Sequence, residues 1–222
     1  MLYDLHNHEL LNIVHLLILD NKLSWKDHIT ELSKKLSRAI GLLYKIRHMC
    51  PSSVLRSLYY SLFNSHLAYG LVLWGNANRS NIDKIRSLQK RALRAITFTP
   101  NDNNIDINHI YFDLKILNID HQLQVQLSSL MWDYDHNTIP PALTTHFKRV
   151  NIIHNYNTRA FSNGNLHHCK VNTYKHGIKS FKYQGIKIIN NFKKMCIYKN
   201  ASSKSIFLKE LKSDLLSSYI TH

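Results

Sequence analysis

Cysteine and glycine are scarce in this chain, and both shortages limit the chemistry open to it. The 222 residues include only three cysteines, Cys50, Cys169 and Cys196, which are widely spaced and odd in number. They do not form a disulfide framework, so a reducing compartment is expected. The six glycines leave little material for a glycine-rich phosphate-binding loop. No Gly-x-Ser-x-Gly motif occurs, so no serine-nucleophile site is indicated.

Long apolar runs are missing as well. No stretch reaches the roughly 18 apolar residues that a membrane-spanning helix requires. The run within Met1 to Leu19 is interrupted by histidines and an acid, and no small-residue cleavage site follows it. This is unlike a secretory signal peptide. We therefore expect an intracellular protein, cytoplasmic or nuclear, that is not secreted.

Acidic residues are outnumbered by basic ones. The chain has 14 Asp and Glu against 29 Lys and Arg, a formal net charge of +15 and a pI of about 9.7. A surplus of this size attracts polyanions, so nucleic acid is the leading expected partner and an anionic membrane surface the second. A basic protein without a specific polyanion partner is the remaining alternative.

Regular structure is predicted to begin near residue 13. Ile13 to Leu19 has the pattern of a short apolar strand that Asp20-Asn21 ends. Ser24 then has the character of a helix N-cap, with Asp27 at the position of the acid in a capping box. Apolar residues at three- and four-residue steps predict one long amphipathic helix that ends near Met49.

Two further helices are expected to complete a small helical bundle. Pro51 suits the first turn of the second helix, and Ser80 is the expected N-cap of the third, which ends before Pro100. Between them, Ala68 to Trp74 is either a short strand or an extended link. The expected inward residues of the second and third helices are Val54, Leu55, Leu58, Tyr59, Leu62 and Phe63, and Ile82, Ile85, Leu88 or Gln89, Ala92, Leu93 and Ile96.

The second half of the chain has a looser pattern. Helices are expected over Ile107 to Leu114 and Asp120 to Asp135, before a Pro-Pro break. Lys148 to Asn172 is rich in Asn, His, Ser and Thr, which predicts either a long irregular region or a tract that orders only against a partner. A strand is expected within Phe181 to Ile189. Ser205 is the expected cap of a final helix with Phe207, Leu208, Leu211 and Leu215 on one side.

Basic residues of the first and third predicted helices form stripes. Side chains four residues apart lie on one side of a helix, here beside its apolar face. Such stripes can follow a phosphate backbone, because each contact releases a counterion. The alternative is a solvated basic face. The predicted nucleic-acid-binding residues are Lys34, Arg38 and Lys45 on the first helix and Arg86, Lys90 and Arg94 on the third.

Several sequence blocks in a fixed order carry a resemblance to a known family. The most informative are Asp20-Asn-Lys-Leu-Ser-Trp-Lys-Asp-His28 and Leu88-Gln-Lys-Arg-Ala-Leu-Arg-Ala-Ile-Thr97, with Trp74-Gly75-Asn76 between them and His154-Asn-Tyr-Asn-Thr-Arg159 beyond. Together they resemble the region downstream of the catalytic palm in reverse transcriptases of non-LTR, jockey-like retrotransposons. The family usually has a Leu-Gly pair where this chain has Leu16-Leu17, and a Trp at the position of Ile189.

The resemblance implies a thumb and a tail without a palm. Residues 1–19 would be a leader and the remnant of the last palm strand, 20–99 a thumb-like helical bundle, and 100–222 a basic C-terminal tail region. The thumb would close on a template-primer duplex and contact its sugar-phosphate backbone. The carboxylates that hold Mg²⁺ would belong to the missing palm, and no Asp-Asp dipeptide occurs here. We therefore expect no catalytic residue, no cofactor and no enzyme activity from this chain alone, although the parent family is an RNA-directed DNA polymerase.

Two candidate metal sites are weak. Asp133 and Asp135 would point about 160° apart on a helix of 3.6 residues per turn, which makes them a poor metal pair. The zinc candidates have a spacing that fits no standard zinc motif. They are His167, His168, Cys169, His176 and Cys196. No metal site is predicted.

These observations predict a mainly α protein with a short N-terminal strand, a thumb-like helical bundle and a looser helical tail. Its expected partner is nucleic acid, either a template-primer duplex or RNA, and not a membrane. Two alternatives remain open. One is a stand-alone basic RNA- or DNA-binding module unrelated to polymerases, and the other is an inactive structural remnant.

Overall fold

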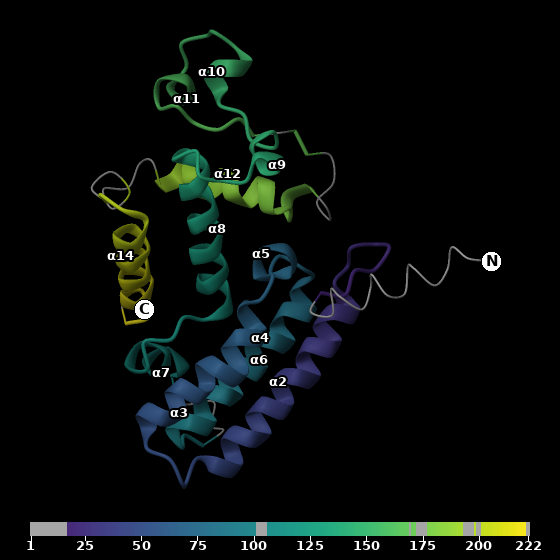
Figure 1. The fold of residues 1–222 in the computed structure, drawn as a ribbon, viewed down its shortest axis with the longest axis vertical. Coiled ribbons are helices and arrows are strands. Elements are labelled where there is room, and N and C mark those ends of the chain that lie inside the picture. Colours follow the sequence, from purple (N-terminus) through teal and green to yellow (C-terminus); the bar gives the residue numbers. More distant parts are fainter. Residues whose placement is uncertain are drawn as a thin grey trace, which may run out of the picture. The chain divides into compact units, whose positions relative to one another are not determined.

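The computed structural model is mainly α-helical, as the sequence predicts (Figure 1). It describes residues 17–100, 106–168, 170–171, 177–192, 198 and 201–220. The chain divides into two compact units, unit 1 up to Ile107 and unit 2 from Asn108. Within the described residues no β-strand forms, and the nearest approach to one is an isolated antiparallel bridge between Arg149 and Leu166.

The first long helix of unit 1, α2 (Lys26–Ile46), confirms the predicted amphipathic helix. Its buried residues recur at short helical steps and are His28, Ile29, Leu32, Leu36, Ala39, Ile40 and Leu43. Ser24 is not its N-cap, contrary to the prediction. Trp25 holds that position with a left-handed φ of 60° and no side-chain cap.

Asp20 stabilises the turn before α2. Its carboxylate accepts hydrogen bonds from the backbone N–H of Ser24 at 2.8 Å and of Trp25 at 3.0 Å. Desolvation alone would raise the pKa of Asp20, but hydrogen bonds from the Ser24 side chain and from both backbone groups outweigh it and lower the pKa below its ordinary value. The predicted strand over Ile13 to Leu19 lies largely outside the described residues, and Leu17 to Leu19 have no regular secondary structure.

A second helical rod runs through α3 (Ser52–Leu58), the π-helix η1 (Tyr59–Asn64) and α4 (Ser65–Ala68). Its fully buried side chains recur at steps of four and are Leu55, Tyr59, Phe63 and Leu67. In an α-helix, steps of four drift by about 40° each around the axis. The wider π turn compensates for that drift and keeps these residues on one face. The predicted inward face was too wide, because Val54 is exposed and Leu58 and Leu62 are half-buried.

The segment that was expected to be a strand or an extended link is helical instead. Gly70 takes a left-handed φ of 61° and α5 (Leu71–Trp74) follows it. Pro51 and Asn78 are the N-caps of the second rod and of α6 (Arg79–Thr97), so the predicted cap at Ser80 is wrong. The predicted apolar face of α6 is confirmed, since all of its members are buried: Ile82, Ile85, Leu88, Gln89, Ala92, Leu93 and Ile96.

Helices α2 and α6 pack along each other and run parallel. At the N-terminal end of α2, the His28 ring lies 5.6 Å from the Trp74 ring, just before α6 begins. At the opposite end, the Arg47 guanidinium lies 5.0 Å from the Phe98 ring, just after α6 ends. Both C-terminal ends therefore meet on the same side of unit 1.

Unit 2 is built around one long helix, α8, against which α12 and α14 pack. Trp132 of α8 stacks on Phe207 of α14 with ring centroids 4.9 Å apart. Tyr219 stacks on Tyr111, and its hydroxyl accepts a hydrogen bond from the backbone N–H of Asn118. The helices found among the described residues from Ile107 onward are α7 (Ile107–Asp113), α8 (Ile119–Asp135), α9 (Pro141–Thr144), α10 (Val150–Ile153), α11 (Arg159–Ser162), α12 (Phe181–Phe192) and α14 (Lys204–Ser217).

Three predictions for unit 2 need correction. The strand expected within Phe181 to Ile189 is wrong, because α12 occupies these residues. The irregular region from Lys148 contains the short helices α10 and α11 in its described part. The cap of α14 is Ser203 rather than Ser205, and its hydroxyl accepts from the backbone N–H of Ile206. No helix in the described part of the chain is long and apolar enough to cross a membrane.

Candidate nucleic-acid interface

Charge is segregated by sign along the two long helices of unit 1. Residues 17–100 contain 14 Lys or Arg and only 4 Asp or Glu. Asp20, Asp27 and Glu31 lie before or early in α2, and Asp83 lies early in α6. No acid occurs from residue 32 to 82 or from 84 to 101. The C-terminal parts of both helices therefore carry cations alone.

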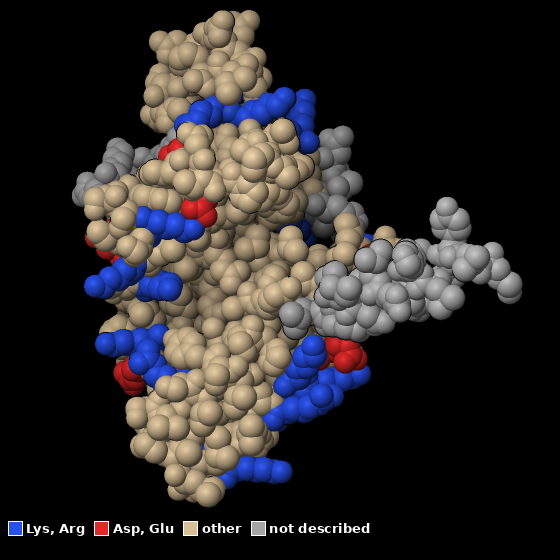
Figure 2. Space-filling view, in the orientation of Figure 1, with Lys and Arg blue, Asp and Glu red and all other residues tan. Residues whose placement is uncertain are grey.

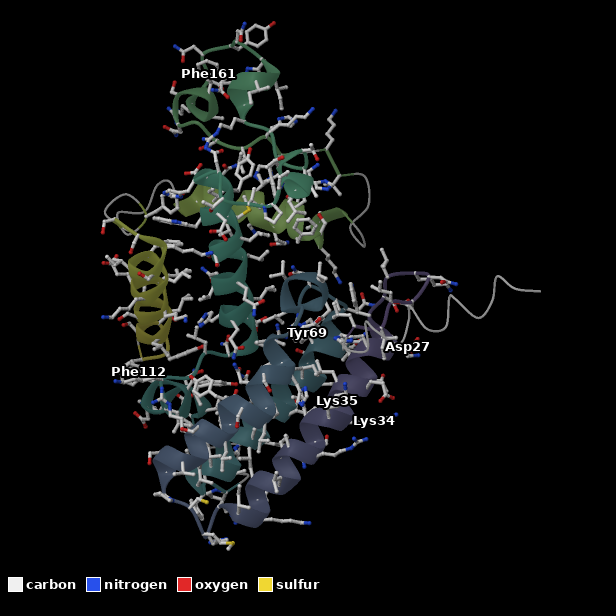
Figure 3. The ribbon with its side chains drawn as sticks, in the orientation of Figure 1. Asp27, Lys34, Lys35, Tyr69, Phe112 and Phe161 are labelled. Atoms are coloured by element: carbon white, nitrogen blue, oxygen red, sulfur yellow. The ribbon has the colours of Figure 1, made fainter. Side chains whose placement is uncertain are left out.

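All three residues of the stripe predicted on α2 are exposed. Lys34, Arg38 and Lys45 lie on the face opposite the buried residues. Basic side chains line this outer edge of α2 (Figure 2), and Lys34 projects away from the other helices of unit 1 (Figure 3). Lys34 pairs with Glu31 one turn earlier, at 2.5 Å. Arg38 and Lys45 take part in none of the ion pairs formed by described residues.

Glu31, the carboxylate paired with Lys34, indicates a positive local potential beside this stripe. The hydrogen bond from Lys34 lowers the pKa of Glu31 below its ordinary value, and the charges of Lys34, Arg38 and Lys35 lower it further, against an opposing contribution from desolvation. A field that stabilises the ionised carboxylate also stabilises a phosphate.

Gly41 lies on the same face, between Arg38 and Lys45. A Cβ placed there would meet no atom within 4 Å. Glycine in a helix interior costs roughly 1 kcal/mol relative to alanine, and no packing contact in unit 1 requires it. What glycine provides is open backbone that a ligand can approach closely.

The stripe predicted on α6 is less accessible. Only Lys90 is exposed, and Arg86 and Arg94 are half-buried. Arg86 forms an ion pair with Asp83 one turn earlier. Asp83 can reach Arg86 because residues three apart on a helix are neighbours. Sequence reasoning identified the stripe, but overlooked the acid that partly neutralises it.

Lys35 borders a small cavity beside the stripe. The cavity holds about 30 Å³ and is lined by His28, His66 and Tyr69 among others. The Nε2 atom of His28 is buried and has no hydrogen-bond partner. The volume of the cavity suits about one water molecule. The cavity is too small for a substrate.

The candidate metal ligands are not gathered into a site in the part of the chain that the structure describes. Asp133 accepts from Lys204 at 2.6 Å, whereas Asp135 accepts from Arg149 at 2.7 Å and from the Tyr198 hydroxyl at 2.6 Å. Each carboxylate thus has its own structural partner in unit 2. The zinc candidates Cys169, His176 and Cys196 lie outside the described residues.

Compared with protein-family profiles, curated proteins and solved structures, the chain has no significant match in any of the three. The resemblance to jockey-like reverse transcriptases therefore rests on the sequence blocks alone. Two of these blocks are adjacent in the structure, since the ring of His28, at the end of the Asp20–His28 block, lies near the ring of Trp74 in the Trp74-Gly75-Asn76 block.

Proposed function

We propose that unit 1 grips a nucleic-acid duplex by its sugar-phosphate backbone, in the manner of a polymerase thumb. On this proposal the chain is the nucleic-acid-gripping C-terminal portion of an RNA-directed DNA polymerase of a non-LTR retrotransposon, without its catalytic palm. The proposal depends mainly on one observation: the C-terminal parts of α2 and α6 contain Lys and Arg but no Asp or Glu. A polyanion would therefore meet no repelling charge from these parts of the two helices.

The dimensions of the α2 stripe suit a backbone track. Lys34 and Lys45 are separated by about 16 Å along a helix that rises 1.5 Å per residue. Phosphates of one DNA strand recur about every 3.4 Å along the duplex axis, so the stripe spans several of them. Gly41 leaves the middle of this track open to close approach. Contacts of this kind position a duplex without reading its sequence.

The proposal assigns binding and no chemical step. Polymerisation requires carboxylates that hold a pair of metal ions around the primer hydroxyl and the leaving pyrophosphate. In the resembled family these groups belong to the palm. The role of unit 1 would be to hold the duplex for such a palm.

A charge-reversal pair tests the proposal. Arg38→Glu with Lys45→Glu reverses the exposed stripe of α2, and Lys209→Glu with Lys212→Glu makes the same change in net charge on the exposed side of α14. Affinity for an RNA-DNA hybrid is measured by fluorescence anisotropy, with circular dichroism to follow the unfolding midpoint. The α2 pair should weaken binding by about tenfold or more. It should also reduce the salt slope by about 0.9 for each phosphate that the variant no longer neutralises.

The control pair, Lys209→Glu with Lys212→Glu, distinguishes binding at the α2 stripe from nonspecific attraction by the net charge of the whole chain. It should leave the affinity within about threefold of wild type, because Lys209 and Lys212 are exposed on α14 of unit 2 and are not part of the α2 stripe. An equal decrease in affinity for both pairs would contradict the proposed interface. Absence of any binding by the wild-type chain would favour the inactive remnant.

A further inference from the structure

The two basic helices end in a shared aromatic and cationic cluster. We call Tyr44, Arg47, His48 and Phe98 the Arg47 cluster. The guanidinium carbon of Arg47 lies 4.9 Å from the Tyr44 ring centroid and 5.0 Å from that of Phe98. Arg47 Nε donates to His48 Nε2 at 3.2 Å, and the His48 ring meets Phe98 edge-on at 5.1 Å. The parallel packing of α2 and α6 therefore assembles an ordered surface from residues distant in sequence.

This cluster is built at the surface rather than in the core. Tyr44 is 40% exposed and Phe98 is 48% exposed, so both residues are accessible to solvent. Phe98 also has a left-handed φ of 58° at the C-cap of α6, where glycine would be unstrained. Holding a bulky aromatic residue in that conformation costs energy. Such strain is characteristic of ligand-contacting positions.

The surroundings of the cluster are cationic. Lys45 is adjacent to Tyr44 on α2, and Arg94 precedes Phe98 by one turn on α6. The C-terminal parts of both helices contain no acid. In the hydrogen bonds of the described residues Arg47 uses Nε alone, which leaves its Nη donors for an incoming anion. Exposed aromatic faces among backbone-tracking cations are the combination that binds single-stranded nucleic acid.

We infer that the Arg47 cluster binds an unpaired nucleotide where a duplex held along α2 passes into a single strand. The base stacks on the open face of Phe98, and the Arg47 guanidinium receives a phosphate oxygen. This inference rests on the proposed function for the paired part of the ligand. It adds a second recognition element, specific for unpaired bases, which the backbone track alone does not provide.

The test compares a blunt RNA-DNA hybrid with the same hybrid carrying a short single-stranded overhang. The fluorescent base analogue aminopurine occupies the first unpaired position. The wild-type chain should bind the overhang hybrid about tenfold more tightly, with a change in aminopurine fluorescence. Phe98→Gly suits the backbone conformation and should reduce overhang binding to the blunt level. Phe98→Tyr, which keeps a ring, should preserve it.

The controls separate this inference from the proposed function. Tyr156→Ala removes an exposed ring of unit 2 and should change neither affinity. Equal affinity of the wild-type chain for both hybrids, or an equal decrease for both with Phe98→Gly, overturns the inference and leaves the duplex grip standing. Failure to bind either hybrid overturns both. Phe98-dependent binding to phosphatidylserine vesicles, without an overhang effect, would assign the cluster to a membrane surface and overturn the inference.

Discussion

The side-chain amide of Gln89 donates a hydrogen bond of 3.0 Å to the hydroxyl of Tyr59 within the core of unit 1. Both side chains are fully buried, with 0% exposure. The bond joins α6 to the π-helix η1. Because a buried polar group without a partner is costly, sliding either helix along the other would be penalised. This pair thus favours one register of α6 against η1.

Removing the Tyr59 hydroxyl should weaken unit 1. We expect Tyr59→Phe to lower the free energy of unfolding by about 1 to 3 kcal/mol, because the buried amide of Gln89 loses this acceptor. Urea denaturation measures this change, and Tyr60→Phe on the exposed side of η1 is the matched control. Combination with Gln89→Met in a double-mutant cycle should reveal a coupling energy. Additive effects would show that the two side chains do not act as a pair.

Gly41 should show opposite effects on stability and on binding. Gly41→Ala is expected to raise the free energy of unfolding by up to about 1 kcal/mol, because alanine is the better helix former and the added Cβ meets no atom. The same change should weaken hybrid binding if a backbone phosphate approaches the helix closely at this point. Ser37→Ala, also exposed on α2, improves helix propensity without adding a Cβ. A Gly41→Ala variant with unchanged affinity would remove Gly41 from the interface.

Acid should destabilise unit 1 through His28. This side chain is only 5% exposed; burial lowers its pKa below the ordinary value, and the charge of Lys35 lowers it further. Below about pH 6.5 the unfolded chain binds a proton that the folded chain does not. Stability therefore rises with pH, is fully present above that value, and is lost as the pH falls toward the folded pKa.

The test follows the unfolding midpoint between about pH 7.5 and 5.5, a window that brackets the ordinary histidine pKa. His28→Gln should show a shallower dependence than wild type. Some dependence will remain, because burial also lowers the pKa of His121 and His168 in unit 2. Identical pH profiles for variant and wild type would show that His28 does not contribute.

Phe207 should be one of the strongest single contributors to unit 2. It is buried between α14 and α8 and stacks on Trp132. Phe207→Ala is expected to cost about 3 to 5 kcal/mol, since it removes a large buried side chain and leaves a cavity. Ile206→Ala, at a neighbouring exposed position, should cost far less. Similar destabilisation by the two variants in denaturant titrations would contradict the packing of α14 on α8.

The parts of the fold that could be predicted are those in which apolar residues repeat regularly along the sequence. The buried faces of α2 and α6 repeat at three and four residues, so their existence could be read directly. Their first residues could not, because the carboxylate of Asp20 and the position of Asn78 decide where each helix begins. Each segment contains more than one residue that could cap a helix, and only the folded backbone shows which residue precedes the first helical turn.

The segment at α12 shows why local pattern is insufficient. Its alternating aromatic and β-branched residues favour a strand, but packing against α8 buries Ile186 and Ile189 on one helical face. Gly185 permits this approach, since a Cβ there would lie 2.7 Å from Sδ of Met131. Tertiary packing overrides the local preference.

The candidate interface was predictable only in part. The spacing of the basic residues was sufficient to predict the α2 stripe. The ion pair of Arg86 with Asp83 could have been predicted only by considering the acidic residue one turn earlier. The Arg47 cluster had no sequence signal, because Phe98 of one helix reaches Arg47 and His48 of the other only through the packing of the two helices.

The proposed cationic track of unit 1 is tested by the affinity of the purified chain for an RNA-DNA hybrid across a salt series, with single strands alongside. We expect clear hybrid binding, with a binding constant whose logarithm falls linearly with the logarithm of the salt concentration. The slope should be several units, at about 0.9 per phosphate contact on duplex DNA and similar for the hybrid. No binding near physiological salt, by a chain that circular dichroism shows to be folded, would contradict it.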